Sequence, residues 1–430
     1  MDPRPGAVPA VSAPQPVNRR TEIRRVMWFF AIVYAVEGVC QAKSGIVWQP
    51  LTYFLKQTHD WDPVRISVSL SVLDVPWIIK PLYGVVSDFV PLFGYRRRIY
   101  LIIANIAGIV AFGSVALGST PAVLITALTV TSVAMAISST LCGALLVEAG
   151  QRLAASARFI NQQWLWYNIA QMVTVVLAGV LLDVLAPIDA LHWAAWIAAT
   201  APIAILASVF LVREQPARLD LPQLRRRGAA LLRAFRARAL WVVAAFLFLY
   251  YFSPGFGTPL YFQLTDRLRF SQGFIGLLSS ATAGGWILGG LLYRWKLQHM
   301  PTPALLRLSL LGGVASTLAY LGLSGEASAI VIWTASGVAG MIVTIASLSL
   351  AAEACPEGAE GFAFAGLMSV INVATPAADV VGSMLYEHVF ARTLTPLILV
   401  SAASTALLFL LLPFVSRSAV SSDAPDRGAG

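Results

Sequence analysis

Charged residues are scarce in this sequence. Asp, Glu, Lys and Arg make up 12% of its 430 residues, whereas a soluble domain averages about 25%. A water-soluble enzyme would need more charge on its outside, so that class of protein is disfavoured. A disordered chain is excluded as well, because 58% of the residues are hydrophobic and so much apolar surface does not stay in water. The composition therefore predicts a protein with several membrane spans.

Cysteine and histidine are also rare. The three cysteines and four histidines are scattered, without the spacing of a disulfide framework or of metal ligands. The sequence shows no P-loop, no dinucleotide fingerprint and no cluster of a nucleophile with a base. We therefore predict no metal site, no cofactor and no enzymatic activity.

Apolar stretches long enough to cross a membrane fill most of the chain. A spanning helix needs about 20 mostly apolar residues, and the first stretch is long enough to tilt or break. The stretches predict an all-α polytopic membrane protein with twelve transmembrane helices: 26–55, 66–87, 99–118, 121–147, 160–183, 191–212, 239–262, 273–293, 304–323, 328–350, 362–385 and 395–415.

The basic residues predict the orientation of these spans. With the N-terminus inside, the inner segments hold 23 of the 30 Lys and Arg and the outer loops hold five, as the positive-inside rule requires. The excess charge thus indicates anionic lipid and not nucleic acid as its partner. We expect a multi-pass protein of the cell (inner) membrane with both termini cytoplasmic, divided into a tail at 1–25, six-helix bundles at 26–212 and 239–415, a basic linker at 213–238 and a tail at 416–430.

The loop after the second span carries a recognisable motif. Two six-helix halves joined by a basic inner loop are the layout of a major facilitator transporter, whose halves rock around a site near the midplane. Major facilitators have a similar Gly-x-x-x-Asp…Gly-x-Arg-Arg turn in this place. Here that turn consists of Gly84, Asp88, Gly94, Arg96, Arg97 and Arg98.

The stretch around this motif resembles the folate-biopterin transporter family. The resemblance is concentrated at 76–101, where it includes Pro76, Trp77, Lys80, Pro81 and Gly84. It continues more weakly along the chain, for example at Glu360 in the tenth loop. The resemblance implies the major facilitator fold, a gating role for these motif residues, and a folate, pterin or related small organic anion as substrate.

Polar residues inside the first two spans are candidates for a substrate or proton pathway, since a charge in the bilayer costs several kcal/mol. Glu37 is expected near the midplane, with Gln41, Ser44 and Trp48 on the same helical face. The simpler alternative for Glu37 is a neutral acid that hydrogen-bonds a neighbouring helix. Lys43 either snorkels outward or meets an anionic substrate group.

In the second span, Asp74 is assigned a coupling or cavity role, against the alternative of a structural hydrogen bond. Lys80 and Asp88 are assigned to an inner charge network that favours one transport state. The fifth span adds Asn168 and Gln171, and the eleventh adds Asn372 and Asp379. Such amides often merely tie helices together, so each alone leaves both roles open.

The seventh span, from Tyr250 to Tyr261, contains two prolines and two glycines. These residues break a helix, and a broken helix at membrane depth is tolerated where it lines a cavity. We expect this stretch, with Tyr250, to form a moving aromatic wall of the pathway.

These observations predict a monomeric secondary active transporter that works by alternating access. The intramembrane acids favour coupling to protons, that is, symport. The alternatives are a major facilitator for another small organic solute and, in a different class, a non-transporting membrane receptor. A receptor would need a soluble signalling domain, which neither the short tails nor the linker offers.

Overall fold

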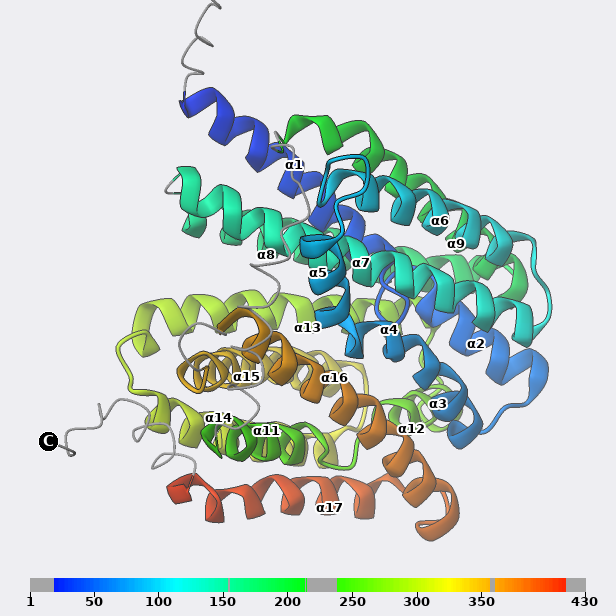
Figure 1. The fold of residues 1–430 in the computed structure, drawn as a ribbon. Coiled ribbons are helices and arrows are strands. Elements are labelled where there is room, and N and C mark those ends of the chain that lie inside the picture. The colour runs from blue at the N-terminus through cyan, green and yellow to red at the C-terminus, as the bar shows by residue number, and fades with distance from the viewer. Residues whose placement is uncertain (1–18, 154, 213, 215–237, 356–359, 415–430) are drawn as a thin grey trace, which may run out of the picture.

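The computed structural model describes residues 19–153, 155–212, 214, 238–355 and 360–414. Most of the two predicted tails and nearly all of the basic linker 213–238 lie outside the described residues, as do the side chains of Asp88 and Glu360. The described part of the chain is almost entirely helical (Figure 1).

The N-terminal half, which we define as α1 to α9, forms the upper part of the molecule in Figure 1. Its α-helices are α1 (Arg19–Cys40), α2 (Trp48–His59), α3 (Pro63–Ser71), α4 (Val75–Ile78), α5 (Lys80–Phe89), α6 (Arg98–Leu117), α7 (Pro121–Leu153), α8 (Ser156–Val184) and α9 (Pro187–Ser208). A short 3-10 turn, Val72–Asp74, joins α3 to α4.

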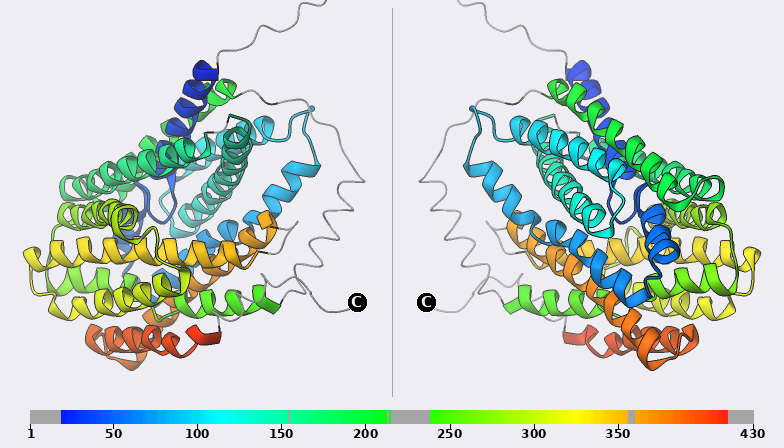
Figure 2. Two further views of the ribbon diagram at one scale, coloured as in Figure 1. Left: turned by 90° about the vertical axis from the view of Figure 1, so that its left-hand side faces the viewer. Right: turned by 90° about the vertical axis from the view of Figure 1, so that its right-hand side faces the viewer.

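The C-terminal half, which we define as α11 to α17, forms the lower part (Figure 1). Its α-helices are α11 (Arg238–Tyr251), α12 (Gly257–Phe262), α13 (Gln272–Leu292), α14 (Thr302–Ala319), α15 (Glu326–Glu353), α16 (Glu360–Met384) and α17 (Leu394–Leu407). The two halves also lie one above the other in Figure 2, and α8 and α13 pack together where they meet.

Every predicted span coincides with helix. Ten helical stretches in the described part of the chain are long and apolar enough to cross a membrane. The two remaining predicted spans, the first and the seventh, are each divided into two helices, α1 with α2 and α11 with α12. The structure thus confirms the predicted all-helical membrane fold and divides the first and seventh spans into separate helices.

We call the end of the molecule where α9 ends and α11 begins the inner end, because the charge distribution predicts it to be cytoplasmic, and the opposite end the outer end. Exposed tryptophans lie toward both ends. Trp28, Trp241 and Trp295 are 58%, 56% and 77% exposed toward the inner end, and Trp193 is 58% exposed toward the outer end. Tryptophan is enriched at the two membrane–water boundaries, so this placement fits helices that cross a bilayer.

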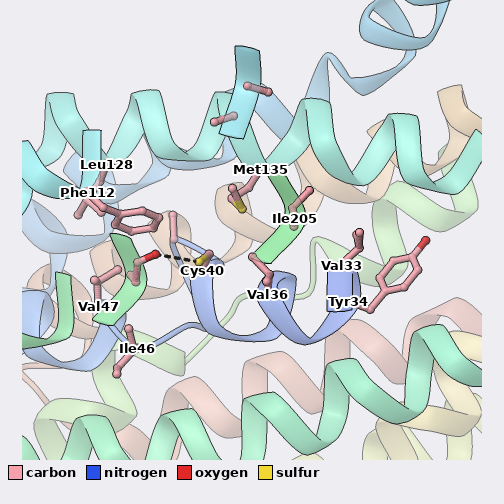
Figure 3. Packing of buried hydrophobic residues seen from close by; sticks show 14 of the residues in the cluster. Val33, Tyr34, Val36, Cys40, Ile46, Val47, Phe112, Leu128, Met135 and Ile205 are labelled. Carbon is pink, nitrogen blue, oxygen red and sulfur yellow. Dashed lines mark hydrogen bonds between the residues drawn. The ribbon is translucent and has the colours of Figure 1, made fainter. Parts of the chain in front are cut away.

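A continuous apolar core holds the N-terminal half together. Figure 3 shows part of it, with residues of α1 facing Phe112, Leu128 and Met135. The Cys40 thiol at the end of α1 donates to the Ala198 carbonyl at 3.4 Å. The C-terminal half has two core clusters of its own, one around Leu247 and one around Leu397.

The first span does not continue as one helix, so the prediction that Gln41, Ser44 and Trp48 share a helical face with Glu37 is wrong. After α1 ends at Cys40, residues 41–47 form turns. The Ile46 amide reaches back to the Val39 carbonyl at 3.0 Å. The fold-back needs a glycine at Gly45, where a Cβ atom would lie 2.3 Å from that same Val39 carbonyl oxygen. The buried side chains of Ile46 and Val47 then anchor the turn in the core (Figure 3).

Candidate substrate pathway at the interrupted helices

The first and seventh spans are interrupted at corresponding places in the two halves. The first is broken at 41–47 and the seventh at 252–256. In transporters built from repeated halves, interrupted helices in corresponding positions mark the substrate site, because irregular backbone at membrane depth is tolerated only where it lines a cavity or is buried in protein. We therefore take these two breaks as the frame of the candidate pathway.

At the seventh-span break, backbone packs directly against α16. The Gly255 amide donates to the Ala378 carbonyl at 2.9 Å. A Cβ atom at Gly382 would collide with the Gly255 oxygen, so position 382 needs glycine. Asp379 of α16 accepts bonds from the amide (3.1 Å) and the hydroxyl (2.7 Å) of Thr258 in the first turn of α12. These two bonds join α16 to the first turn of α12, directly beyond the break.

The second span is interrupted as well. It passes through the 3-10 turn that ends at Asp74, then α4, and leaves helical geometry at Ile79 before α5 starts. Pro81 has no N–H, so it cannot donate to the carbonyl four residues earlier, that of Trp77. The side-chain amide of Asn372, from α16 in the other half, donates to this carbonyl at 2.9 Å. One hydrogen bond thus joins the halves beside the break.

Lys43 and Asp74 form an ion pair between the first- and second-span breaks. The Lys43 ammonium lies 2.5 Å from Oδ2 of Asp74 and 5.8 Å from the centre of the Trp48 ring. The two side chains are 26% and 19% exposed, so both are only partly buried. Asp74 also interacts electrostatically with Asp379 across the interface.

Glu37 and Lys80 are connected through Ser139 of α7. The Ser139 hydroxyl donates to Glu37 Oε1 at 3.0 Å and accepts from the Lys80 ammonium at 3.1 Å. The Lys80 ammonium also lies 4.5 Å from the centre of the Trp77 ring. Oε2 of Glu37 is buried and has no hydrogen-bond partner among the described residues. It can therefore take up a proton without breaking the bond to Ser139.

A small cavity adjoins Glu37 and is lined also by Val33, Met135, Ser138 and Ile205. Figure 3 labels Val33, Met135 and Ile205 around this region. Ser139 lines the cavity as well, so Glu37 borders a space that both apolar and hydroxyl side chains enclose.

Other predicted pathway residues lie elsewhere. The Asn168 amide is bonded to the Trp164 carbonyl of its own helix at 2.7 Å. The backbone of Gln171 packs against Gly38 of α1. Tyr250 is 7% exposed and belongs to the core of the C-terminal half. Gln171 thus lies beside the α1 turn that carries Glu37, whereas Asn168 bonds within its own helix and Tyr250 lies in the core of the other half.

The motif residues at the inner end form a separate polar cluster. Gly94 has a φ of +82°, which favours glycine, and Gly84 faces α7. A carboxylate that the sequence did not reveal, Glu214, accepts from the backbone amides of all three motif arginines: Arg96, Arg97 and Arg98.

Arg97 in turn donates to Glu148 at 2.7 Å and to Ser87 at 3.2 Å. Glu214, Glu148 and Ser87 belong to the same half as the motif. Lys80 does not join this cluster in the structure, because its ammonium contacts Ser139 and the Trp77 ring instead. The arginines thus form an inner polar cluster of their own, whereas Lys80, which was predicted to join Asp88 there, lies with Glu37.

Polar side chains join the halves at the outer end. The Gln49 amide donates to the backbone oxygen and side-chain oxygen of Gln272 at 2.8 and 3.0 Å. Lys56, 8% exposed, pairs with Asp266 and Thr265 and lies 4.4 Å from the centre of the Phe262 ring.

Asp183 at the end of α8 accepts from the amides of Gln272 and Gly273, at 2.9 and 2.8 Å. Its negative charge thus lies at the N-terminus of α13, where the helix dipole favours it. Since α8 and α13 belong to different halves, Asp183 is a further link between them at the outer end.

Backbone contact between α8 and α13 continues inward from these bonds. A Cβ atom at Gly179 would lie 2.4 Å from the Gln272 carbonyl oxygen, and one at Gly276 would lie 2.4 Å from the Val175 carbonyl oxygen. Further inward, the Ser280 hydroxyl donates to the Met172 carbonyl at 2.7 Å. Small residues allow the two helices to approach this closely.

Known proteins resemble this chain over most of its length. The BT1 family matches residues 41–426. The chain belongs to the BT1 family. It is 29% identical over 372 residues to the "Folate-biopterin transporter" of Synechocystis sp., covering 82% of this chain and 73% of that protein. It is 25% identical over 398 residues to "Probable folate-biopterin transporter 2" of Arabidopsis thaliana, covering 86% of this chain and 78% of that protein.

Solved structures with the same architecture are major facilitator transporters. A D-xylose–proton symporter superposes with a TM-score of 0.71 at 14% identity, covering 91% of this chain and 97% of the symporter. The nucleoside transporter NupG gives 0.66 at 14% identity, covering 93% and 98%. The chain thus has the major facilitator fold and is a membrane transporter of small molecules, not an enzyme.

Proposed function

We propose that this BT1-family protein moves a folate, a pterin or a related small organic anion across the cell (inner) membrane by alternating access, coupled to protons, with both termini in the cytoplasm. The observation that carries the proposal is the likeness to the Synechocystis folate-biopterin transporter, which covers 82% of this chain. Rocking of α1–α9 against α11–α17 would expose the breaks of the first and seventh spans to each side in turn.

The chemistry at the breaks supports this substrate class. A pterin is a flat heteroaromatic ring with donors and acceptors along its edges, and aromatic faces with polar partners suit it. Trp48 and Trp77 each lie under a lysine ammonium, Lys43 and Lys80. Those cations add the positive charge that the glutamyl tail of folate requires.

Proton coupling is assigned to Glu37. Its bond to Ser139 links it to Lys80, and its second oxygen is free to bind a proton. Loading and unloading this proton changes the charge balance beside the second-span break, and Asn372 connects that break to the other half. A change at Glu37 can therefore bias the arrangement of the halves.

The test is uptake by purified protein in liposomes. Wild-type protein should accumulate labelled folate or biopterin when the outside is more acidic than the lumen. Glu37→Gln should abolish the response of biopterin uptake to the gradient while exchange of biopterin across the membrane continues. Glu326→Gln, the same chemical change at an exposed position in the first turn of α15, should behave like wild type. A gradient response in Glu37→Gln equal to that of wild type would refute the coupling role.

A further inference from the structure

Lys43 differs from the other buried or half-buried cations in how it is held. Lys56 is enclosed by Asp266, Thr265 and the Phe262 ring at the outer end. Lys43 lies in the non-helical segment of the first span, where its hydrogen-bond partner in the described part of the chain is Asp74. An ammonium has three donors, so Lys43 has capacity for a further acceptor.

The Asp74 side chain likewise has Lys43 as its hydrogen-bond partner in the described part of the chain. It lies at the end of the 3-10 turn in the second span, and its contact with Lys43 is made through Oδ2. The charged groups that act on it are Lys43 and, from α16 across the interface, Asp379. Asp379 is held by its two bonds to Thr258, so it stays on the C-terminal side of the interface when Lys43 moves away.

Charge balance then decides what happens when an anionic ligand arrives. With an ionised Asp74, a ligand carboxylate at Lys43 would leave two negative groups for one positive group, next to the charge of Asp379. A site within the membrane opposes such an excess strongly. If Asp74 binds a proton at Oδ2 as the ligand carboxylate takes its place, the site again holds one positive and one negative group. The proton comes from water on the side to which the site is open.

We propose that Lys43 is the residue that binds the substrate's carboxylate, that Asp74 is the internal carboxylate it displaces, and that one proton on Asp74 accompanies each bound carboxylate. Trp48, whose ring lies beside the Lys43 ammonium, offers an aromatic face next to this position. The ligand class is accordingly a heteroaromatic carboxylic acid, and a neutral pterin does not need Lys43. This inference rests on the proposed transport function and assigns its anion specificity.

The test compares a carboxylate substrate with a neutral one in the same liposomes. Labelled folate carries two carboxylates, and labelled biopterin carries none. Lys43→Met should lower folate uptake at least tenfold and leave biopterin uptake within about twofold of wild type. Lys43→Arg should restore folate uptake. Lys296→Met, at an exposed position near the inner end, is the matched control and should change neither.

Asp74→Asn gives a second, independent readout. An amide resembles the protonated acid, so folate exchange across the membrane should persist while accumulation driven by the proton gradient falls at least tenfold. Loss of folate and biopterin uptake to the same extent in Lys43→Met, or unchanged folate uptake, would overturn the inference. Wild-type protein that takes up neither substrate would instead refute the proposed function itself, so the two failures are distinguishable.

Discussion

The two ends of the interface between the halves are built differently. At the outer end, Gln49 and Lys56 bond across to the C-terminal half, and Asp183 binds the start of α13. At the inner end, the bonds between described residues, such as those of Arg97 with Glu148 and of Thr302 with Glu353, stay within one half. In the proposed alternating-access mechanism, the outer contacts break and the inner ends move as units during a transport cycle.

The central part of the interface contains a hydrogen bond between the halves and, beside it, the candidate binding residues. Asn372 ties the halves together, yet it does so through a carbonyl that Pro81 leaves without its usual donor. The candidate residues for substrate and proton binding, Lys43 and Glu37, lie in the N-terminal half, on one side of this hydrogen bond. The comparison therefore distinguishes residues that hold the outer end closed from residues that we propose to bind substrate and protons. The following substitutions test this distinction.

The largest effect is expected where backbone touches backbone. In Gly276→Ala the new Cβ atom would lie 2.4 Å from the Val175 carbonyl oxygen, so α8 and α13 could no longer close. Overpacking of this kind costs about 1–3 kcal/mol, which corresponds to at least a roughly fivefold shift away from the closed outer end. Uptake in liposomes should fall about tenfold.

Gly284→Ala on the same helix is the control, because no atom outside its own helix lies within 4 Å of a Cβ built there. It should transport like wild type. Equal losses in the two variants would show that the helix, and not the outer contact, is sensitive to alanine.

A smaller effect is expected from Asn372→Leu. The Trp77 carbonyl would lose its donor from the other half, and an unsatisfied buried polar group costs about 1–3 kcal/mol. We expect a threefold to tenfold loss of uptake and a lower temperature of unfolding. Thr375→Val, three residues along α16 with its hydroxyl bonded to its own helix, should change neither. If Asn372→Leu matched wild type in both measurements, the hydrogen bond between Asn372 and Trp77 would contribute neither to transport nor to stability.

The smallest effect is expected from the outer ion pair, because Asp266 is 54% exposed and exposed pairs contribute about 0.2–1 kcal/mol. A cysteine at Ser280, which lies inward of the outer contact, reports opening through its rate of reaction with a thiol reagent added outside. Lys56→Met and Asp266→Asn should each raise this rate up to about fivefold, and the double variant should add little to Lys56→Met. Additive effects would mean that the two residues do not act as a pair.

Hydropathy and charge were sufficient to predict the helices. The bilayer requires long apolar helices wherever backbone crosses it, so all twelve predicted spans coincide with helix. The interruption of the seventh span was visible as prolines and glycines. The turn at 41–47 was not foreseen in detail, because it depends on Gly45 meeting the carbonyl of Val39, a contact that only the folded chain defines.

The pairing of site residues was harder to predict than their identity. Glu37, Lys43, Asp74 and Lys80 stand out as charges within spans, but the sequence does not reveal that Ser139 connects Glu37 to Lys80. Glu214 was missed because it lies beside the basic linker, where an acid looks like ordinary surface charge. Tyr250 was assigned to the pathway from its neighbours, and its burial in the core depends on how α11 is rotated.

The central claim is that the two ends of the interface open alternately as substrate is carried. Distances between spin labels measure this directly in lipid nanodiscs. One pair, at Thr58 and Arg267, spans the outer end, and another, at Arg158 and Arg294, spans the inner end; all four positions are exposed. On addition of folate at acidic pH, the two distances should change in opposite directions. If both stayed fixed, or both lengthened together, while the labelled protein still transported folate, alternating access around these helices would be contradicted.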